Sequence, residues 1–205
     1  MGITERRQRQ KEEVRISILK AAWHLVESEG WQAVSIRKIA DAIEYSIPVI
    51  YDHFENKEAI FLEFTKRGFQ LLNEDIIKAG SVSNQPEEQL EAIAYSYWGF
   101  AFDNKEYYQL MYGLGLPSCE TANRITELKT FAQLIIDPIS RLISKSNNNE
   151  SDPFLKFQTF WSLLHGLISI NMLNKESQRE ELNRLVLKDF INGFIFSIKG
   201  QQLSK

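Results

Sequence analysis

Several side chains between Ser35 and Lys57 have the chemistry needed to contact an anionic polymer. Arg37, Tyr51, His53 and Lys57 carry N–H or O–H groups that can donate to anionic oxygens. Between them lies a run of short hydroxyl and apolar side chains, formed by Ser46, Ile47, Pro48 and Val49. Donors toward phosphates and small groups toward base edges are the two components of a protein surface that binds duplex DNA.

A second set of residues, far along the chain, could hold an apolar ligand. Trp161, His165 and Ile168 follow at spacings of four and three, so they share one face of a helix. Other large side chains could supply the opposing wall of a pocket, namely Trp98, Phe102, Tyr108, Met111 and Tyr112. An aromatic cluster with one titratable group suits an apolar or aromatic ligand. Packing of the same residues in an ordinary core stays open as the alternative.

The sequence gives little support to catalysis or metal binding. Its three histidines, His24, His53 and His165, lie in different predicted elements, and Cys119 is the single cysteine. There is no His-Glu-x-x-His pattern, and Cys119 has no evident base partner. We therefore expect no catalytic residues, no metal site and no cofactor, and we do not expect an enzyme.

The donors and the apolar run must be positioned by helices. Apolar residues recur at helical spacing from Gln10 to Glu29, and Gly30 ends that pattern as a C-terminal cap. Ser35 is a plausible N-cap for a short second helix ending near Ile43. Ser46 could cap a third helix reaching Phe54, with Pro48 in its first turn, and Asn56 could cap a long helix over 57–79.

Two short helices joined by a tight turn are typical of a helix-turn-helix. Ile50 and Phe54 are four residues apart, so they would form the packed face of the third helix. The residues left at its exposed end, Ser46 to Val49, would then read the base edges in the major groove.

The segment Ser35–Ile60, with its ending Tyr-x-His-Phe-x-x-Lys-Glu-Ala, resembles the signature of the TetR family. This resemblance implies an all-α fold, with an N-terminal three-helix helix-turn-helix domain on DNA and a C-terminal helical domain for ligand binding and dimerisation. The expected DNA-binding residues are Ser35, Arg37, Ser46, Ile47, Pro48, Val49, Tyr51, His53 and Lys57. Two departures stand out, because the family usually has glycine at position 44 and a basic residue at position 47. Glu44 would cost up to about 1–2 kcal/mol if the turn needs a left-handed backbone.

The C-terminal half carries a weaker resemblance. Trp161, His165 and Gly166 match a Trp-x-x-x-His-Gly element of one TetR subfamily, whose helices enclose an effector pocket. We expect helices over 87–103, 105–114, 118–145, 153–173 and 176–199, with a kink or break near Asp137-Pro138. The expected domains are residues 1–57, a connecting helix over 57–79, and residues 80–205.

We also expect a homodimer built from the last two helices. Their apolar residues exceed the needs of one subunit's core, and the set comprises Phe157, Leu164, Leu167, Leu182, Leu185, Val186, Phe190 and Phe194. Gly166 and Gly193 could permit close helix approach. The DNA-binding domains of two subunits, which we call heads, must lie about 34–36 Å apart to enter successive major grooves, so DNA binding itself requires a dimer.

Composition places the chain among globular proteins, and charge is unevenly distributed. Residues 1–57 hold nine basic and nine acidic side chains, whereas the remainder holds 15 and 18. Arg6, Arg7, Arg9 and Lys11 form a basic arm that could approach phosphates or remain a solvated terminus. We see no secretory or transit segment and no membrane span, so we expect a cytoplasmic protein.

Together these features predict a ligand-responsive transcriptional regulator. It would be a repressor released from a palindromic double-stranded DNA operator by a small apolar or aromatic effector. The alternative left open is a helical ligand-binding module without specific DNA binding.

Overall fold

The computed structural model describes residues 2–112, 125–146, 148, 151–173 and 180–200, and within these ranges the chain is helical with no strand. The expected all-α class is thereby confirmed. Contacts between Cα atoms divide the chain into two compact units. The division passes through one long helix after Gly68, and it assigns residues 106–112 to the first unit.

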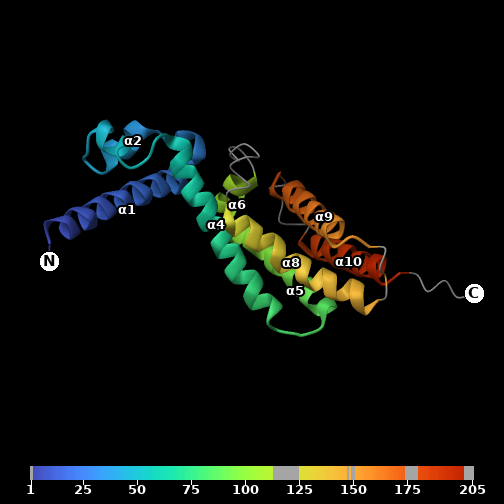
Figure 1. The fold of residues 1–205 in the computed structure, drawn as a ribbon. Coiled ribbons are helices and arrows are strands. Elements are labelled where there is room, and N and C mark those ends of the chain that lie inside the picture. Colours follow the sequence, from blue (N-terminus) through green and yellow to red (C-terminus); the bar gives the residue numbers. More distant parts are fainter. Residues whose placement is uncertain (1, 113–124, 147, 149–150, 174–179, 201–205) are drawn as a thin grey trace, which may run out of the picture. The chain divides into compact units, whose positions relative to one another are not determined.

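The first unit begins with a long helix and three short elements (Figure 1). These are α1 (Ile3–Glu29), a 3₁₀ turn η1 (Trp31–Ala33), α2 (Ile36–Ala42) and α3 (Ile47–Tyr51). α4 (Lys57–Gly80) follows and continues into the second unit. The basic arm expected near the N-terminus is thus the first part of α1, and it is helical.

Local signals explain where these helices begin and end. The N–H of Gly30 donates to the carbonyl of Val26 at 2.9 Å with φ at +84°, so Gly30 caps α1 as expected. The N–H of Ala59 donates to Oδ1 of Asn56 at 2.8 Å, which caps α4. α3 is shorter than expected, ending at Tyr51 rather than Phe54, although Phe54 still donates to the carbonyl of Ile50 at 2.9 Å.

One hydrophobic cluster holds the first unit together. It joins α1, η1, α2, α3, α4 and a later helix, α6 (Lys105–Tyr112). α6 enters through Leu110, and the indole N–H of Trp31 donates to the carbonyl of Glu106 at 3.1 Å. The buried members are Ile18, Ala22, Val26, Trp31, Val34, Ile39, Ala40, Ile50, Phe54, Ile60, Phe64 and Leu110.

The second unit is a bundle formed by the end of α4 and four further helices. These are α5 (Pro86–Asp103), α8 (Thr126–Lys145), α9 (Pro153–Leu173) and α10 (Glu180–Lys199). α9 and α10 run side by side along α5 and α8 (Figure 1). α8 is a single helix with Pro138 inside it, so the break expected near Asp137-Pro138 does not occur. The parts of the expected helices that fall in residues 113–124 and 176–179 lie outside the described residues.

The core of this bundle corrects one detail of the expected dimer surface. Phe157 and Leu164 of α9 and Phe194 of α10 are buried within the chain itself. Phe157 packs on Phe131 of α8, and Phe194 packs on Phe160 of α9. Leu182, Leu185 and Val186 of the expected set are exposed, and the other large apolar side chains exposed on these two helices are Phe154, Leu155, Leu163, Ile170 and Phe196.

Candidate functional site

α2 is positioned by its cap and its buried side. The hydroxyl of Ser35 accepts from the N–H of Lys38 at 3.2 Å, and Ile39 and Ala40 are buried. This leaves Arg37 on the open side, where its side chain is 83% exposed and 3.9 Å from Asp41. A pair of exposed side chains at that separation is weak, so Arg37 can readily turn toward an external anion.

The turn between α2 and α3 is closed by two backbone bonds. Tyr45 donates its N–H to the carbonyl of Ala40 at 3.0 Å, and Glu44 donates to that of Asp41 at 3.3 Å. These are the bonds of a Schellman motif, which requires a left-handed residue at its C′ position. Glu44 occupies that position with φ at +58°, the only positive φ of a non-glycine residue in the described chain. The strain expected at the usual glycine position is therefore present.

α3 has one anchored face and one open face. Ile50 and Phe54 are buried in the cluster, as expected from their spacing. Ser46 stands at the N-cap position without a side-chain cap bond, and Pro48 occupies the first turn. Ser46, Ile47, Pro48 and Tyr51 are exposed, and Val49 is half-buried. The structure thus brings the residues expected to read base edges onto one open surface.

The residues after α3 meet the basic part of α1. A hollow of about 460 Å³ is lined by Asp52 and His53 and, on α1, by Arg7, Gln10, Lys11 and Val14. Burial is the main cause that lowers the pKa of His53, and the positive charge of Lys11 adds to it. Neutral His53 and the cations Arg7 and Lys11 therefore share this hollow with the carboxylate of Asp52. Arg7 and Lys11 belong to the basic arm that could approach phosphates, but only the tertiary fold places them beside His53.

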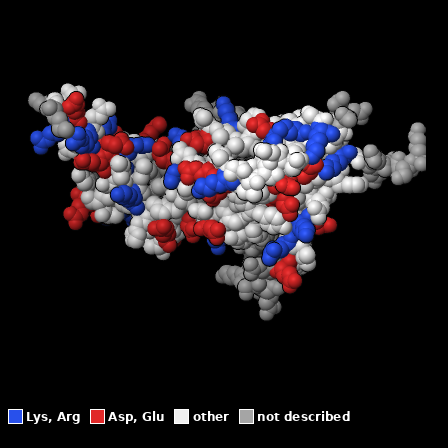
Figure 2. Space-filling model, turned by 90° about the horizontal axis from the view of Figure 1, so that it is seen from below, with Lys and Arg blue, Asp and Glu red and all other residues white. Residues whose placement is uncertain are grey.

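Lys57 lies at the start of α4 and is half-buried, with its Nζ 5.3 Å from the ring centre of Phe61. Arg15 of α1 fixes the neighbouring elements, since it pairs with Glu63 at 2.9 Å and lies 4.5 Å from the ring centre of Phe54. In Figure 2 basic and acidic side chains alternate across the visible face.

The eight residues expected to bind a ligand fall into two groups. Trp98 and Phe102 lie on α5 with ring centres 4.8 Å apart, and Trp161, His165 and Ile168 lie on α9, all in the second unit. Tyr108, Met111 and Tyr112 lie on α6 and belong by their contacts to the first unit. Tyr108 and Met111 are buried there.

Polar contacts in the second unit involve the tryptophan and histidine on α9. The indole N–H of Trp161 donates to the hydroxyl of Tyr97 at 3.3 Å, and Nε2 of His165 lies 3.4 Å from the hydroxyl of Ser169. Burial lowers the pKa of His165, so its neutral form predominates at neutral pH. Trp161 also stacks on Phe157 with ring centres 5.8 Å apart. A neutral imidazole among aromatic rings is compatible with an uncharged or aromatic ligand.

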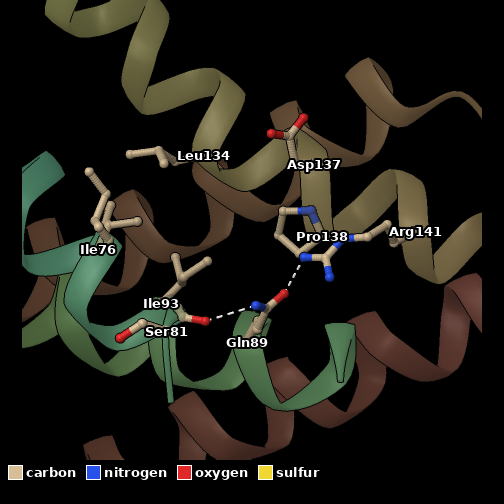
Figure 3. A pocket seen from close by; sticks show the side chains of 10 residues that line it. Ile76, Ser81, Gln89, Ile93, Leu134, Asp137, Pro138 and Arg141 are labelled. Atoms are coloured by element: carbon tan, nitrogen blue, oxygen red, sulfur yellow. Dashed lines mark hydrogen bonds between the residues drawn. The ribbon is translucent and has the colours of Figure 1, made fainter. Parts of the chain in front are cut away.

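A separate groove of about 290 Å³ lies in the second unit between α4, α5 and α8 (Figure 3). Gln89 bridges it, donating to the carbonyl of Gly80 at 2.8 Å and accepting from Arg141. Pro138 has no N–H to donate to the carbonyl of Leu134, and both residues line the groove. This groove was not predicted from the sequence, in which the proline within a helical pattern is its one local signal.

In the described part of the chain, no group of three or more His, Cys, Asp or Glu side chains could hold a metal ion. Within those residues, no helix is long and apolar enough to cross a membrane.

Comparison with known protein families gives a match to each half of the chain. Residues 18–64 match the model of bacterial regulatory proteins of the tetR family, and residues 90–186 match a model described as a tetracyclin repressor-like C-terminal domain. The chain belongs to the TetR family. It is accordingly a transcriptional regulator with a DNA-binding N-terminal domain and a ligand-binding C-terminal domain, and TetR-family regulators form dimers.

Two curated relatives share low sequence identity with the chain over long alignments. The chain is 24% identical over 187 residues to the uncharacterized HTH-type transcriptional regulator YobS of Bacillus subtilis, covering 89% of this chain and 93% of YobS. It is also 24% identical over 147 residues to the HTH-type transcriptional activator FasR of Mycolicibacterium smegmatis, covering 69% of this chain and 64% of FasR.

Solved structures confirm the TetR fold. AibR, in complex with isovaleryl coenzyme A and operator DNA, has a TM-score of 0.62 at 16% identity. The likeness covers 87% of this chain and 96% of AibR. At this identity the match bears on the fold alone.

Proposed function

We propose that this TetR-family protein is a repressor that binds a palindromic operator through α3 and leaves it when a small apolar or aromatic effector binds. In this proposal residues 1–57 contact DNA, the helix over 57–79 connects, and residues 80–205 bind the effector and form the dimer. The observation that carries it is the geometry of α3 and the residues beside it: Ile50 and Phe54 are buried, while Ser46, Ile47, Pro48 and Tyr51 are exposed. A recognition helix needs this division between a packed face and a groove-facing one.

Phosphate contacts would come from residues around α3. Arg37 on α2, Tyr51 on α3 and Lys57 at the start of α4 all have accessible donor groups. His53 would add a further contact together with Arg7 and Lys11 of α1 across the hollow described above. Ser35, whose hydroxyl caps α2, would help to position the start of that helix against the DNA backbone.

Dimerisation would use the exposed apolar surface that we call the α9/α10 face, formed by Leu163, Ile170, Leu182, Leu185, Val186 and Phe196. Leu163 and Ile170 are one heptad apart on α9, with Gly166 between them. A Cβ added at Gly166 or Gly193 would meet no atom of the described chain within 4 Å. Two copies of these helices would bury this face in a four-helix interface related by a two-fold axis.

The effector would be recognised by the aromatic set in the C-terminal half, consistent with the Trp-x-x-x-His-Gly subfamily that residues 161–166 resemble. Trp98, Phe102, Trp161, His165 and Ile168, all in the second unit, would contact the ligand. AibR, described in complex with isovaleryl coenzyme A and operator DNA, is a precedent for a protein of this fold that binds a ligand with an apolar group. An effector that prefers the conformer with displaced heads by about 100-fold would supply roughly 2.7 kcal/mol per site.

A second candidate is a ligand-binding module whose head lacks specific DNA affinity. It is favoured by one observation, the absence of any Lys or Arg between Lys38 and Lys57.

A mobility-shift assay of the full-length protein separates the two candidates. The probe is the DNA upstream of its own gene, titrated at about 50 mM and 200 mM salt. Operator binding predicts a dissociation constant that weakens steeply between these salts, because phosphate contacts release counterions. Equal, weak binding to this DNA and to a scrambled duplex would instead support the module.

Repression itself needs a separate measurement, since FasR is named an activator. A reporter under the upstream DNA should rise when the gene is deleted. An effector that releases the purified protein from the probe, with isovaleryl coenzyme A as the first compound tested, should also raise the reporter when it is supplied to the cells. A fall of the reporter on deletion would replace repression by activation.

A further inference from the structure

The reading surface of the head has an unusual composition. The exposed residues at and before α3 are Tyr45, Ser46, Ile47, Pro48 and Tyr51. Three of them are large and partly apolar, and Tyr45, Ile47 and Tyr51 are 46%, 42% and 52% exposed. We call Tyr45, Ile47, Pro48 and Tyr51 the α3 patch.

Charge near the α3 patch is negative. Between Lys38 and Lys57 the sequence contains no Lys or Arg, but it contains Asp41, Glu44, Asp52 and Glu55. Between Gln32 and Asn56 it contains no Asn or Gln either. The cations near the head lie on other elements, with Arg37 on α2, Lys57 on α4, and Arg7 and Lys11 on α1.

Each base pair demands a different partner in the major groove. Guanine is read by Arg or Lys at O6 and N7, adenine by Asn or Gln at N6 and N7, and cytosine by a carboxylate at N4. Thymine alone presents an apolar group, its C5-methyl, to apolar side chains. The α3 patch has none of the first two kinds of side chain. Carboxylates beside it are repelled by the phosphates that flank every base.

We propose that the α3 patch reads thymine methyl groups, so that the central specificity of each operator half-site lies in T·A pairs. The inference rests on the proposed operator binding and names the bases that this same surface selects. Ile47 and Pro48 make the methyl contacts, because they are adjacent, exposed and at the end of α3 that enters the groove. The hydroxyls of Ser46 and Tyr51 contact the groove edge or backbone and discriminate little between bases.

Anchoring of α3 supports this assignment. Ile50 is fully buried and Phe54 nearly so, which fixes the rotation of the helix and leaves Ile47 and Tyr51, four residues apart, exposed. Rotation of α3 to bring other side chains toward the bases would expose Ile50. The apolar character of the reading surface is therefore built into the packed head.

The test begins with duplexes selected from a randomised library by the full-length protein, at a salt concentration where binding is salt-dependent. Thymines of the selected half-site are then replaced one at a time by deoxyuracil, which removes only the methyl group. We expect about a threefold to fivefold weaker binding at two or more positions, the size expected for one buried methyl group. In the Ile47→Ala variant, the ratio of the dissociation constants for the deoxyuracil and thymine duplexes should fall toward 1 at one or more of these positions.

A matched control is Val82→Ala, which truncates an 81% exposed apolar residue outside the head and should leave the deoxyuracil profile unchanged. A flat profile in a protein that binds its selected duplex would overturn the inference. So would a half-site whose binding is lost when guanine is replaced by 7-deazaguanine and not when thymine is replaced. Failure to select any salt-dependent duplex would instead remove the proposed operator binding itself.

Discussion

The backbone N–H of Tyr45 donates to the carbonyl of Ala40 at 3.0 Å, and this bond holds the turn between the two helices of the DNA-binding head. It forms only because Glu44, between them, takes φ at +58°. A side chain with a Cβ is strained in that conformation, and the motif gives no alternative. The turn that sets the direction of α3 therefore includes a strained backbone conformation at Glu44.

Replacing Glu44 by glycine should relieve this strain. We expect Glu44→Gly to stabilise the protein by about 1 kcal/mol, since part of the gain is offset by the greater freedom of glycine in the unfolded chain. The urea midpoint at fixed protein concentration measures the effect. Glu44→Ala is the matched control, because it removes the carboxylate but keeps the Cβ. An equal gain in both variants would show that the charge, and not the backbone, sets the cost.

Protonation of His53 should couple DNA binding to pH. Burial and then Lys11 lower the pKa of His53 below 6.5, so its contribution to stability is full above pH 6.5 and is lost as the pH falls through the lowered value. A phosphate beside it would favour the charged form and raise that pKa again. Operator affinity should thus increase by up to about tenfold from pH 8 to pH 6 in the natural protein.

Two variants isolate this effect from the titration of other groups. His53→Gln should flatten the dependence of operator affinity on pH, whereas His24→Gln, which changes an exposed histidine of α1, should retain it. If both variants keep the same pH dependence, His53 does not meet a phosphate.

The α9/α10 face should control assembly. Ile170 is 62% exposed, and a glutamate there would leave an unpaired charge in the proposed interface. Ile170→Glu should be monomeric by light scattering at micromolar concentration and bind the operator at least about 100-fold more weakly, since avidity is lost. Val82→Glu, an exposed change elsewhere, should remain dimeric. A dimeric Ile170→Glu protein with full operator affinity would exclude this face.

Glu87 should stabilise the C-terminal bundle, and this stabilisation should be lost in strongly acidic solution. Burial raises its pKa, but hydrogen bonds from Lys199, from its own backbone and from Lys145 outweigh that effect and lower the pKa to about 2. Lys199 and Lys145 lie 2.8 and 3.2 Å from one carboxylate oxygen. The stabilisation is complete above about pH 4.5 and is lost as the pH falls toward 2.

Glu87→Gln should therefore lose stability at pH 6 and converge with the natural protein near pH 2. The loss should be about 1 kcal/mol, because both lysines are about half-exposed and screened by water. Glu88→Gln, an exposed neighbour in the same helical turn, controls for the helix dipole. Parallel stability curves for Glu87→Gln and the natural protein across this range would rule out the cluster as the cause.

Helix boundaries and the anchored face of α3 were predictable from the sequence because their causes are local. Ser35, Gly30 and Asn56 bond to backbone groups within four residues, so their types alone mark where helices begin and end. Ile50 and Phe54 were correctly predicted to be buried from their spacing of four. The length of α3 was overestimated, because its last residues form a turn and not a continued helix.

Contacts between distant segments were decided only by the tertiary structure. Tyr107 of α6 stacks on Trp23 of α1 with ring centres 4.0 Å apart, which joins α6 to the head, and no periodicity within either helix signals this. The same holds for Lys11 beside His53 and for the burial of Phe157, Leu164 and Phe194 in the bundle core. Helical spacing tells which residues share a face, but which face meets which neighbour depends on packing over the whole chain.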